Sequence, residues 1–205
     1  MAKINPNANV VAYILAGGES RRFNCQIKGL QRLQNKPLIQ HVITRLEPQV
    51  STININSHFD EYAQFGFPLV PDFNDKFMGP LAGLLASMQH LNTYHPEIEW
   101  LMIVPCDSPL LPHDLVFHLS QNSDHYQACC IEYQKQLQPP FSLWHKSLIE
   151  KLEDAVMHKQ WGGLKAFINS LEHKVNIIEY PEQDNDPFIN INSSDDLQQL
   201  EHFLS

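Results

Sequence analysis

Residues 10–22 read VVAYILAGGESRR, and this stretch decides the fold. Val10–Leu15 is a short apolar run, rich in β-branched residues, and it leads directly into Gly17-Gly18. A run of this kind that ends at glycines is typical of a buried strand entering a tight turn. Ligands of open parallel sheets bind beyond the carboxyl ends of the strands. The glycine turn therefore predicts the place of a functional site as well as the start of a sheet.

The chain that follows alternates strands with helices. The alternation of Ile53 and Ile55 with polar neighbours predicts a strand at 51–56. The segments at 67–70 and 100–104 predict further strands. Segments that begin at Pro37, Pro80 and Pro112 predict helices with one apolar face, and residues 58–65 also look helical. Such alternation is typical of a mainly parallel sheet with helices on both faces, a doubly wound α/β domain.

After residue 125 the order is less regular. We expect strands at 128–133, 141–144, 174–179 and 188–190, with a helix at 148–157 between them. Ser193 and Asp196 have the spacing of a capping box, which predicts a last helix. The C-terminal part should therefore add a mixed portion to the sheet.

Length and composition set further limits. The 205 residues suit one domain, and 43% apolar residues are enough for a buried core. A net charge of −9 argues against a nonspecific nucleic-acid binder. The longest apolar run, residues 10–16, is far shorter than the roughly 20 residues of a membrane helix. With no secretory signal recognised, we expect no membrane partner and a cytoplasmic location.

Cysteines and histidines give no metal or disulfide pattern. The four cysteines contain no C-x-x-C pair, and the eleven histidines contain no H-E-x-x-H motif. The basic residues, in contrast, are unevenly placed. Residues 1–50 hold seven of the 14 Lys and Arg residues but only two of the 23 acidic ones. This asymmetry indicates either a solvated basic face or a local site for an anion.

Candidate site residues follow the ends of the predicted strands. Gly17, Gly18, Arg22 and Lys28 form a phosphate-binding pattern, although not that of a Walker or dinucleotide loop. Asp107 follows the strand at 100–104, where its carboxylate could hold Mg²⁺ or merely cap a turn.

Polar residues at other strand ends extend this pattern. Asn54 and Asn56 share one face of a strand and could contact a base or a ribose. Asp72 follows the next strand, and the helix that begins after Gly79 offers an N-terminus to an anion. Asn190 and Asn192 repeat the paired amides before the last helix.

These motifs together resemble the molybdenum cofactor guanylyltransferases. The resemblance runs in order from residue 10 to residue 201. It implies an α/β/α sandwich like that of the nucleotide-diphospho-sugar transferases. It also implies transfer of GMP from GTP to the terminal phosphate of molybdopterin, with release of pyrophosphate. A nucleotide-binding half at about 1–120 and an acceptor-binding half at about 121–205 are expected. Transient contacts with molybdoenzymes or other cofactor-biosynthesis proteins are expected as well.

The resemblance also assigns roles to matching positions. The loop would contact the nucleotide through Leu15, Ala16, Gly17 and Gly18. Lys28 and Arg22 would offset phosphate charge, and Asp107 would bind GTP and Mg²⁺; these three are the candidate catalytic residues. Asn54 and Asp72 would bind guanosine, while Asn190 and Asn192 would lie toward the pterin.

Three positions depart from the family's pattern. Ile27 replaces an Asp before Lys28, Ser57 replaces an Arg, and Gly162 falls where an Arg pair is common. Two alternatives therefore stay open: a related cytidylyl- or sugar-phosphate nucleotidyltransferase, and a noncatalytic relative that binds GTP or molybdopterin.

Overall fold

A seven-stranded sheet organises the molecule. The computed structural model describes residues 9–18, 27–72, 79–121 and 123–204. The strand order is β5-β4-β1-β6-β8-β7-β9. The strands are β1 (Val10–Leu15), β4 (Thr52–Asn56), β5 (Leu69–Val70), β6 (Trp100–Pro105), β7 (Ala128–Tyr133), β8 (Gln136–His145) and β9 (Val175–Glu179). Within this sheet only β8 runs against its neighbours, so the sheet is mainly parallel with a mixed C-terminal part.

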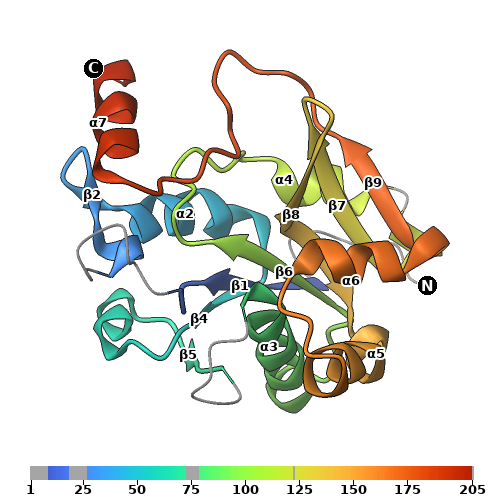
Figure 1. The fold of residues 1–205 in the computed structure, drawn as a ribbon. Coiled ribbons are helices and arrows are strands. Elements are labelled where there is room, and N and C mark those ends of the chain that lie inside the picture. Colours follow the sequence, from blue (N-terminus) through green and yellow to red (C-terminus); the bar gives the residue numbers. More distant parts are fainter. Residues whose placement is uncertain (1–8, 19–26, 73–78, 122, 205) are drawn as a thin grey trace.

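Helices cover both faces of the sheet (Figure 1). On one face lie α2 (Leu38–Leu46) and α4 (Leu115–Ser120). On the other lie α3 (Pro80–Tyr94), α5 (Ile149–Glu153) and α6 (Leu164–Ser170). The expected three-layer α/β/α sandwich is therefore confirmed. Short helices complete the elements: η2 (Lys28–Leu30), η3 (Glu47–Gln49), η4 (Asp60–Phe65), η5 (Ser123–His125), η6 (Lys146–Leu148), η7 (Asp154–His158) and η8 (Glu172–Lys174).

The position of β1 explains its uninterrupted apolar sequence. It pairs in parallel with β4 on one side and with β6 on the other. Ala12 and Ile14 pack toward α2 and α4, whereas Val11 and Tyr13 pack toward α3. A strand buried on both faces needs apolar side chains at every position, so no polar alternation is seen.

The last helix lies apart from these layers. Helix α7 (Ser194–Phe203) begins with the expected capping box between Ser193 and Asp196. It packs over the hairpin of β2 (Arg32–Leu33) and β3 (Lys36–Pro37), where Leu33 and Leu200 belong to one small apolar cluster. The chain end therefore returns to the segment that follows the glycine turn (Figure 1).

Some expectations need correction. Residues 188–190 form no strand; Phe188 sits in a turn, and its ring packs against Tyr133, Phe141 and Tyr180. Its apolar character therefore serves the core and not a sheet. Helix α4 begins at Leu115, later than Pro112, and the helix expected at 148–157 changes from α5 into the π-helical turn η7. Helix α6 was not predicted. In the described part of the chain no helix has the length and apolarity needed to cross a bilayer.

Candidate active site

A cavity of about 210 Å³ opens at the carboxyl edge of the parallel strands. Most of the predicted site residues line it: Leu15, Ala16, Gly17, Gly18, Lys28, Asp72 and Asp107. They come from the ends of β1, β5 and β6 and from η2, which agrees with the expectation that ligands of a parallel sheet bind beyond the carboxyl ends of its strands. Asn56 and the start of the helix after Gly79, which the sequence also indicated as possible ligand contacts, line the cavity as well, through Asn56, Gly79, Pro80 and Gly83. Pro105, Cys106 and Pro140 are lining residues that the sequence did not assign to a ligand.

The basic residues of the first 50 positions that the structure describes do not gather at this cavity. Arg45 donates to the Leu111 carbonyl oxygen, and Arg32 donates to the Asn35 carbonyl oxygen. Arg22 lies outside the described residues. Among the described cations of this segment, Lys28 alone lines the cavity. The charge asymmetry therefore indicates the region of the cavity through Lys28, whereas Arg32 and Arg45 serve other contacts.

Neighbouring strands fix the glycine turn after β1. The Ala16 amide donates to the Asn56 carbonyl oxygen over 2.8 Å, and the Cys106 amide donates to the Leu15 carbonyl oxygen over 3.2 Å. Ser57 is buried and donates from Oγ to the Ala16 carbonyl oxygen over 3.3 Å. Backbone contacts from β4 and β6 thus hold the turn at the cavity rim.

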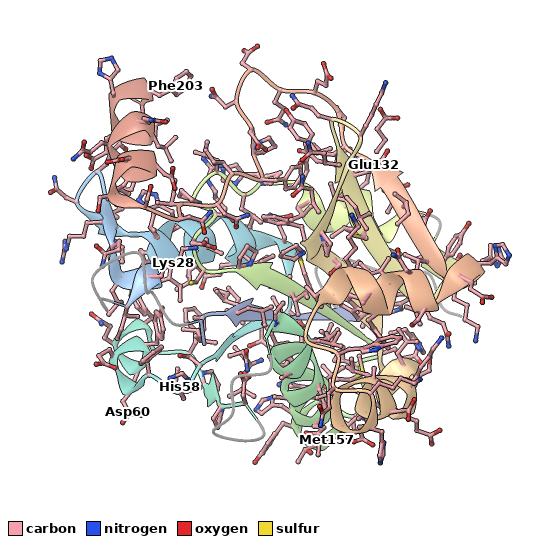
Figure 2. All side chains as sticks on the ribbon, viewed as in Figure 1. Lys28, His58, Asp60, Glu132, Met157 and Phe203 are labelled. Carbon is pink, nitrogen blue, oxygen red and sulfur yellow. The ribbon has the colours of Figure 1, made fainter. Side chains whose placement is uncertain are left out.

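Lys28 and Asp107 meet at the centre of this edge. Lys28 begins η2, and its ammonium forms an ion pair with Asp107 Oδ2. Asp107 is only 5% exposed, so its carboxylate needs this partner. Figure 2 shows Lys28 beside the carboxyl end of β6. The pair brings together the two residues that the sequence assigns to the phosphate and to the metal.

Cys106 lies beneath this pair and does not act as a nucleophile. Burial, together with the neighbouring Asp107 carboxylate, raises the pKa of its thiol to about 12. A thiol with this pKa stays protonated at neutral pH. A Cβ at Gly29 would lie 2.6 Å from the Tyr62 hydroxyl and 3.2 Å from Cys106 Sγ, so only glycine fits there.

Asn56 and Asp72 form a second polar group in the cavity. Asn56 Nδ2 donates to Asp72 Oδ1 over 2.8 Å and to the Val70 carbonyl oxygen over 2.9 Å. Gly83 of α3 faces the same amide, because a Cβ on it would lie 2.5 Å from Asn56 Oδ1. The close approach of α3 therefore depends on glycine at this position.

Asn54 occupies a different position from Asn56. It is 1% exposed, lies outside the cavity lining, and its Nδ2 has no hydrogen-bond partner among the described residues. Asn190 and Asn192 also lie outside the lining. Ser108 donates to Asn190 Oδ1, and Lys28 donates to Asn192 Oδ1, both over 2.8 Å. The late asparagines thus reach the site through other residues.

The start of α3 is less open than the sequence suggests. The Leu81 amide donates to the Gly162 carbonyl oxygen over 3.2 Å, and the Ala82 amide donates to the Gly79 carbonyl oxygen over 3.1 Å. Gly79 has a φ of 79°, and a Cβ on it would lie 2.7 Å from the Gly162 oxygen. These two amides are therefore already satisfied by the chain, and an anion there would have to displace Gly162.

The donor set suits a hard cation that keeps part of its own ligands. No cluster of three or more His, Cys, Asp or Glu side chains able to hold a metal occurs in the described ranges. Two carboxylates, Asp72 and Asp107, do line the cavity. Mg²⁺ typically binds one or two carboxylates and completes its shell with water and substrate phosphates. The residues present therefore fit Mg²⁺ held jointly with a phosphorylated ligand.

A glycine turn, a lysine and two carboxylates at the carboxyl edge of a mainly parallel sheet are typical of α/β proteins whose ligand binds beyond the strand ends. Residues 12–175 match the MobA-like NTP transferase domain. The chain belongs to this family, and the resemblance drawn from its motifs is confirmed.

Curated relatives carry one common name. The molybdenum cofactor guanylyltransferase of Shewanella halifaxensis is 34% identical over 94% of this chain and 94% of its own length. The molybdenum cofactor guanylyltransferase of Yersinia pestis strain Pestoides F is 40% identical over 71% of this chain and 73% of its own.

Solved structures share the fold. Molybdopterin-guanine dinucleotide biosynthesis protein A from Archaeoglobus fulgidus aligns with a TM-score of 0.73 and 21% identity, over 95% of this chain and 98% of that one. 4-Diphosphocytidyl-2C-methyl-D-erythritol synthase from Anaerococcus prevotii aligns with a TM-score of 0.72 and 12% identity, over 96% of each chain. These likenesses support the three-layer architecture.

Proposed function

We propose that this protein transfers GMP from GTP to the terminal phosphate of molybdopterin, forming molybdopterin guanine dinucleotide and pyrophosphate. The names of relatives 34–40% identical over most of the chain support this reaction. The observation that carries it is the pairing of Lys28 with Asp107 in a cavity beside the glycine turn. A lysine for phosphates and a carboxylate for a metal are what nucleotidyl transfer requires.

The chain's own residues position the reacting groups. Backbone groups of the turn at Gly17 and Gly18 border the triphosphate, and the Lys28 ammonium offsets charge on the leaving pyrophosphate. Arg22, whose structure is not described, is the second proposed cation. Asp107, with Asp72 nearby on the lining, would hold Mg²⁺, which supplies further charge neutralisation at the phosphates when bound.

We propose that the nucleoside binds on the side of the cavity formed by Asn56 and Asp72. We assign its recognition to Asn56 and Asp72, whose side chains line the cavity and hold each other. Asn54 keeps its role as a prediction from the resemblance. The acceptor would approach from the half of the chain after residue 121, which contributes Pro140 to the lining. Ser57 and Gly162 stand where the family resemblance implies arginines, so the acceptor phosphate would lack those two sources of charge.

A nucleotide competition decides among the candidate functions. Purified protein is incubated with Mg²⁺, molybdopterin and either GTP or CTP, and pyrophosphate and dinucleotide are measured. Release with GTP, lost in EDTA, is expected. Preferential release of pyrophosphate with CTP would identify a cytidylyltransferase. The erythritol synthase shares this fold, so the fold alone does not decide between GTP and CTP. GTP binding without pyrophosphate release would identify a noncatalytic carrier.

We propose a cytoplasmic location and transient protein partners from the chemistry of the cysteines and of the product. Cys106, Cys129 and Cys130 are free and buried, which suits the reducing cytoplasm. The product is a finished cofactor for other enzymes, so transient contacts with molybdoenzymes or cofactor-biosynthesis proteins are proposed as well. Fractionation of cells and crosslinking of the product-loaded protein would test both points.

A further inference from the structure

Among the described residues next to Lys28 in the sequence, none has an acidic side chain that could orient the ammonium. Ile27 precedes it, and η2 contains no acidic residue in its first turn. An ammonium group has three donors and a flexible stem, so its direction is set by the acceptors around it. Two acceptors from the described part of the chain hold Lys28: Asp107 Oδ2 and Asn192 Oδ1.

The amide of Asn192 has only one satisfactory orientation. Its Oδ1 accepts from Lys28 Nζ over 2.8 Å, while its Nδ2 donates to the Asn190 carbonyl oxygen over 3.1 Å. A reversed amide would point N–H groups at the ammonium and an oxygen at a carbonyl oxygen. Both contacts would then be repulsive, so the two partners fix the amide as an acceptor for Lys28.

The backbone of Asn192 is fixed as firmly as its side chain. Its amide donates to Asp196 Oδ2 over 2.8 Å, and the Ser193 amide donates to the same oxygen over 2.9 Å. These bonds belong to the capping region of α7, whose Leu200 shares a buried apolar cluster with Leu33 of β2 and Leu38 of α2. The helix that ends the chain therefore holds Asn192 in place next to Lys28.

The same segment also holds the loop that carries Asp107. The Ile191 amide donates to the Asp107 carbonyl oxygen over 3.0 Å, and Ser108 Oγ donates to Asn190 Oδ1 over 2.8 Å. Residues 190–192 therefore contact both members of the Lys28–Asp107 pair. We refer to residues 190–192 as the brace.

We propose that Asn192 is a positioning residue that directs the Lys28 ammonium toward the phosphates of the bound nucleotide. This inference rests on the proposed function. When Asp107 binds a metal, its contact with Lys28 must weaken, and Asn192 is then the acceptor that stays. A neutral amide orients the ammonium without cancelling its charge, whereas a carboxylate would compete with the phosphates.

This role differs from the acceptor contact that the family resemblance implies for Asn192. A residue that orients Lys28 changes the affinity for the nucleotide even when no molybdopterin is present. A residue that touches the pterin changes only the acceptor's KM. The two roles are therefore separated by nucleotide binding measured in the absence of acceptor.

The experiment is a double-mutant cycle on the full chain. The Kd of GTP, and in parallel of CTP, is measured with Mg²⁺ by calorimetry for wild type, Asn192→Ala, Lys28→Met and the double variant. Asn192→Ala is expected to weaken binding about tenfold, because a hydrogen bond to a charged group is lost. In the Lys28→Met background the same change is expected to have no further effect.

Two further variants make the test specific. Asn192→Asp places a carboxylate against Lys28 that competes with the phosphates, so it should bind GTP at least as weakly as Asn192→Ala. Asn92→Ala removes the same amide from an exposed position at the far end of α3 and should leave binding unchanged. Thermal unfolding of each variant checks that the fold is intact.

The outcomes separate this inference from the proposed function. If Lys28→Met weakens binding but Asn192→Ala does not, or if the two effects add, the inference is overturned and the proposed function stands. If Asn192→Ala raises only the KM of molybdopterin, the amide is an acceptor contact and the inference is overturned. If the wild type binds neither nucleotide, the proposed function fails and the inference fails with it.

Discussion

The ammonium of Lys28 rests against the carboxylate of Asp107 at the carboxyl edge of the sheet. This contact joins η2 to the loop after β6, two segments that are far apart in the sequence. Each group satisfies the other in the absence of ligand, and each must change partners when a nucleotide and a metal bind. The first two predictions follow from this exchange.

Asp107→Asn should abolish most of the turnover while leaving nucleotide binding in place. The amide keeps the shape of the side chain but removes the charge that a divalent cation needs. We expect pyrophosphate release with Mg²⁺ to fall by about 10²-fold or more. Binding of GTP in EDTA should be as tight as in wild type or tighter, because Lys28 has lost its internal counterion. Turnover at the wild-type rate would exclude Asp107 as the metal ligand.

Lys28→Met should increase the affinity for a divalent cation in the absence of nucleotide. In the wild type a metal must displace the ammonium from Asp107, and the variant removes this competitor. We expect Mn²⁺ to bind about tenfold more tightly, as measured by electron paramagnetic resonance, although turnover is lost. Lys36→Met removes the same charge from an exposed residue and is the control. Equal Mn²⁺ affinity in all three proteins would show that the Lys28 ammonium does not compete with the metal for the Asp107 carboxylate.

Gly83→Ala should damage the nucleotide side of the cavity. The added methyl group would lie 2.5 Å from Asn56 Oδ1, and that amide is held by Asp72 and by the Val70 carbonyl oxygen. We expect a loss of about 1–3 kcal/mol in the free energy of unfolding. Replacement of glycine by alanine inside a helix normally increases stability, so a loss would show that the clash outweighs this effect. Urea unfolding measures this loss, and GTP binding should weaken with it.

Two comparisons confirm the cause of the Gly83 effect. Gly163→Ala adds the same methyl group where no heavy atom lies within 4 Å, so its stability should change little. Asn56→Ala in the Gly83→Ala protein removes the clash and should restore part of the lost stability. Simple addition of the two losses would contradict the predicted contact.

Asn56 and Asn54 should respond differently to substitution. Asn56→Ala removes a lining amide and should weaken GTP binding about tenfold. Asn54→Leu replaces a buried amide whose Nδ2 has no partner among the described residues. Because an unsatisfied buried donor is costly, the leucine variant should gain about 1 kcal/mol of stability and bind GTP normally. A loss of GTP affinity in Asn54→Leu would instead support the role implied by the family resemblance.

Local signals explain why much of the fold could be predicted. The strand β1 is marked by its apolar run, α3 by the glycine and proline at its start, and α7 by its capping box. Each of these features acts within a few residues. The strand–helix alternation then leaves few arrangements for a parallel sheet.

Features set by distant contacts could not be read in the same way. The hairpin between β7 and β8 turns at Gln134 and Lys135, which adopt positive φ values of 48° and 60° without glycine or asparagine. Strand β8 includes Pro139 and Pro140, residues that normally argue against a strand. Packing of β8 between β6 and β7 overrides these local preferences.

The residues of the candidate site also differ in whether a local sequence pattern or a distant contact places them. The glycine turn, Lys28 and Asp107 could be predicted because they follow strands or lie close to one in the sequence. The contact between Lys28 and Asn192 joins positions 164 residues apart, and no local pattern indicates it. The arrangement of Asn56 with Gly83 likewise depends on how α3 packs on β4.

The buried thiols should make the protein less stable at alkaline pH. Burial raises the pKa of both Cys129 and Cys130 to about 12, from an ordinary value of 9.0. Their stabilising contribution is fully present below the unfolded-state pKa and is lost as the pH rises toward the folded-state pKa, since the unfolded chain releases these protons first. Each thiol should lower the free energy of unfolding by up to about 1.4 kcal/mol per pH unit in this window.

Urea unfolding between pH 8 and pH 11 measures this dependence. A Cys129→Ala/Cys130→Ala variant should show a shallower decline than the wild type, because two of the groups that release protons on unfolding are gone. Other groups with raised pKa values, Tyr13 and Tyr180 among them, remain in both proteins and cancel in the comparison. Burial between the sheet and its helices should make these thiols ionise less readily in the folded chain than in the unfolded chain. Equal declines of the free energy of unfolding in the two proteins would contradict this prediction.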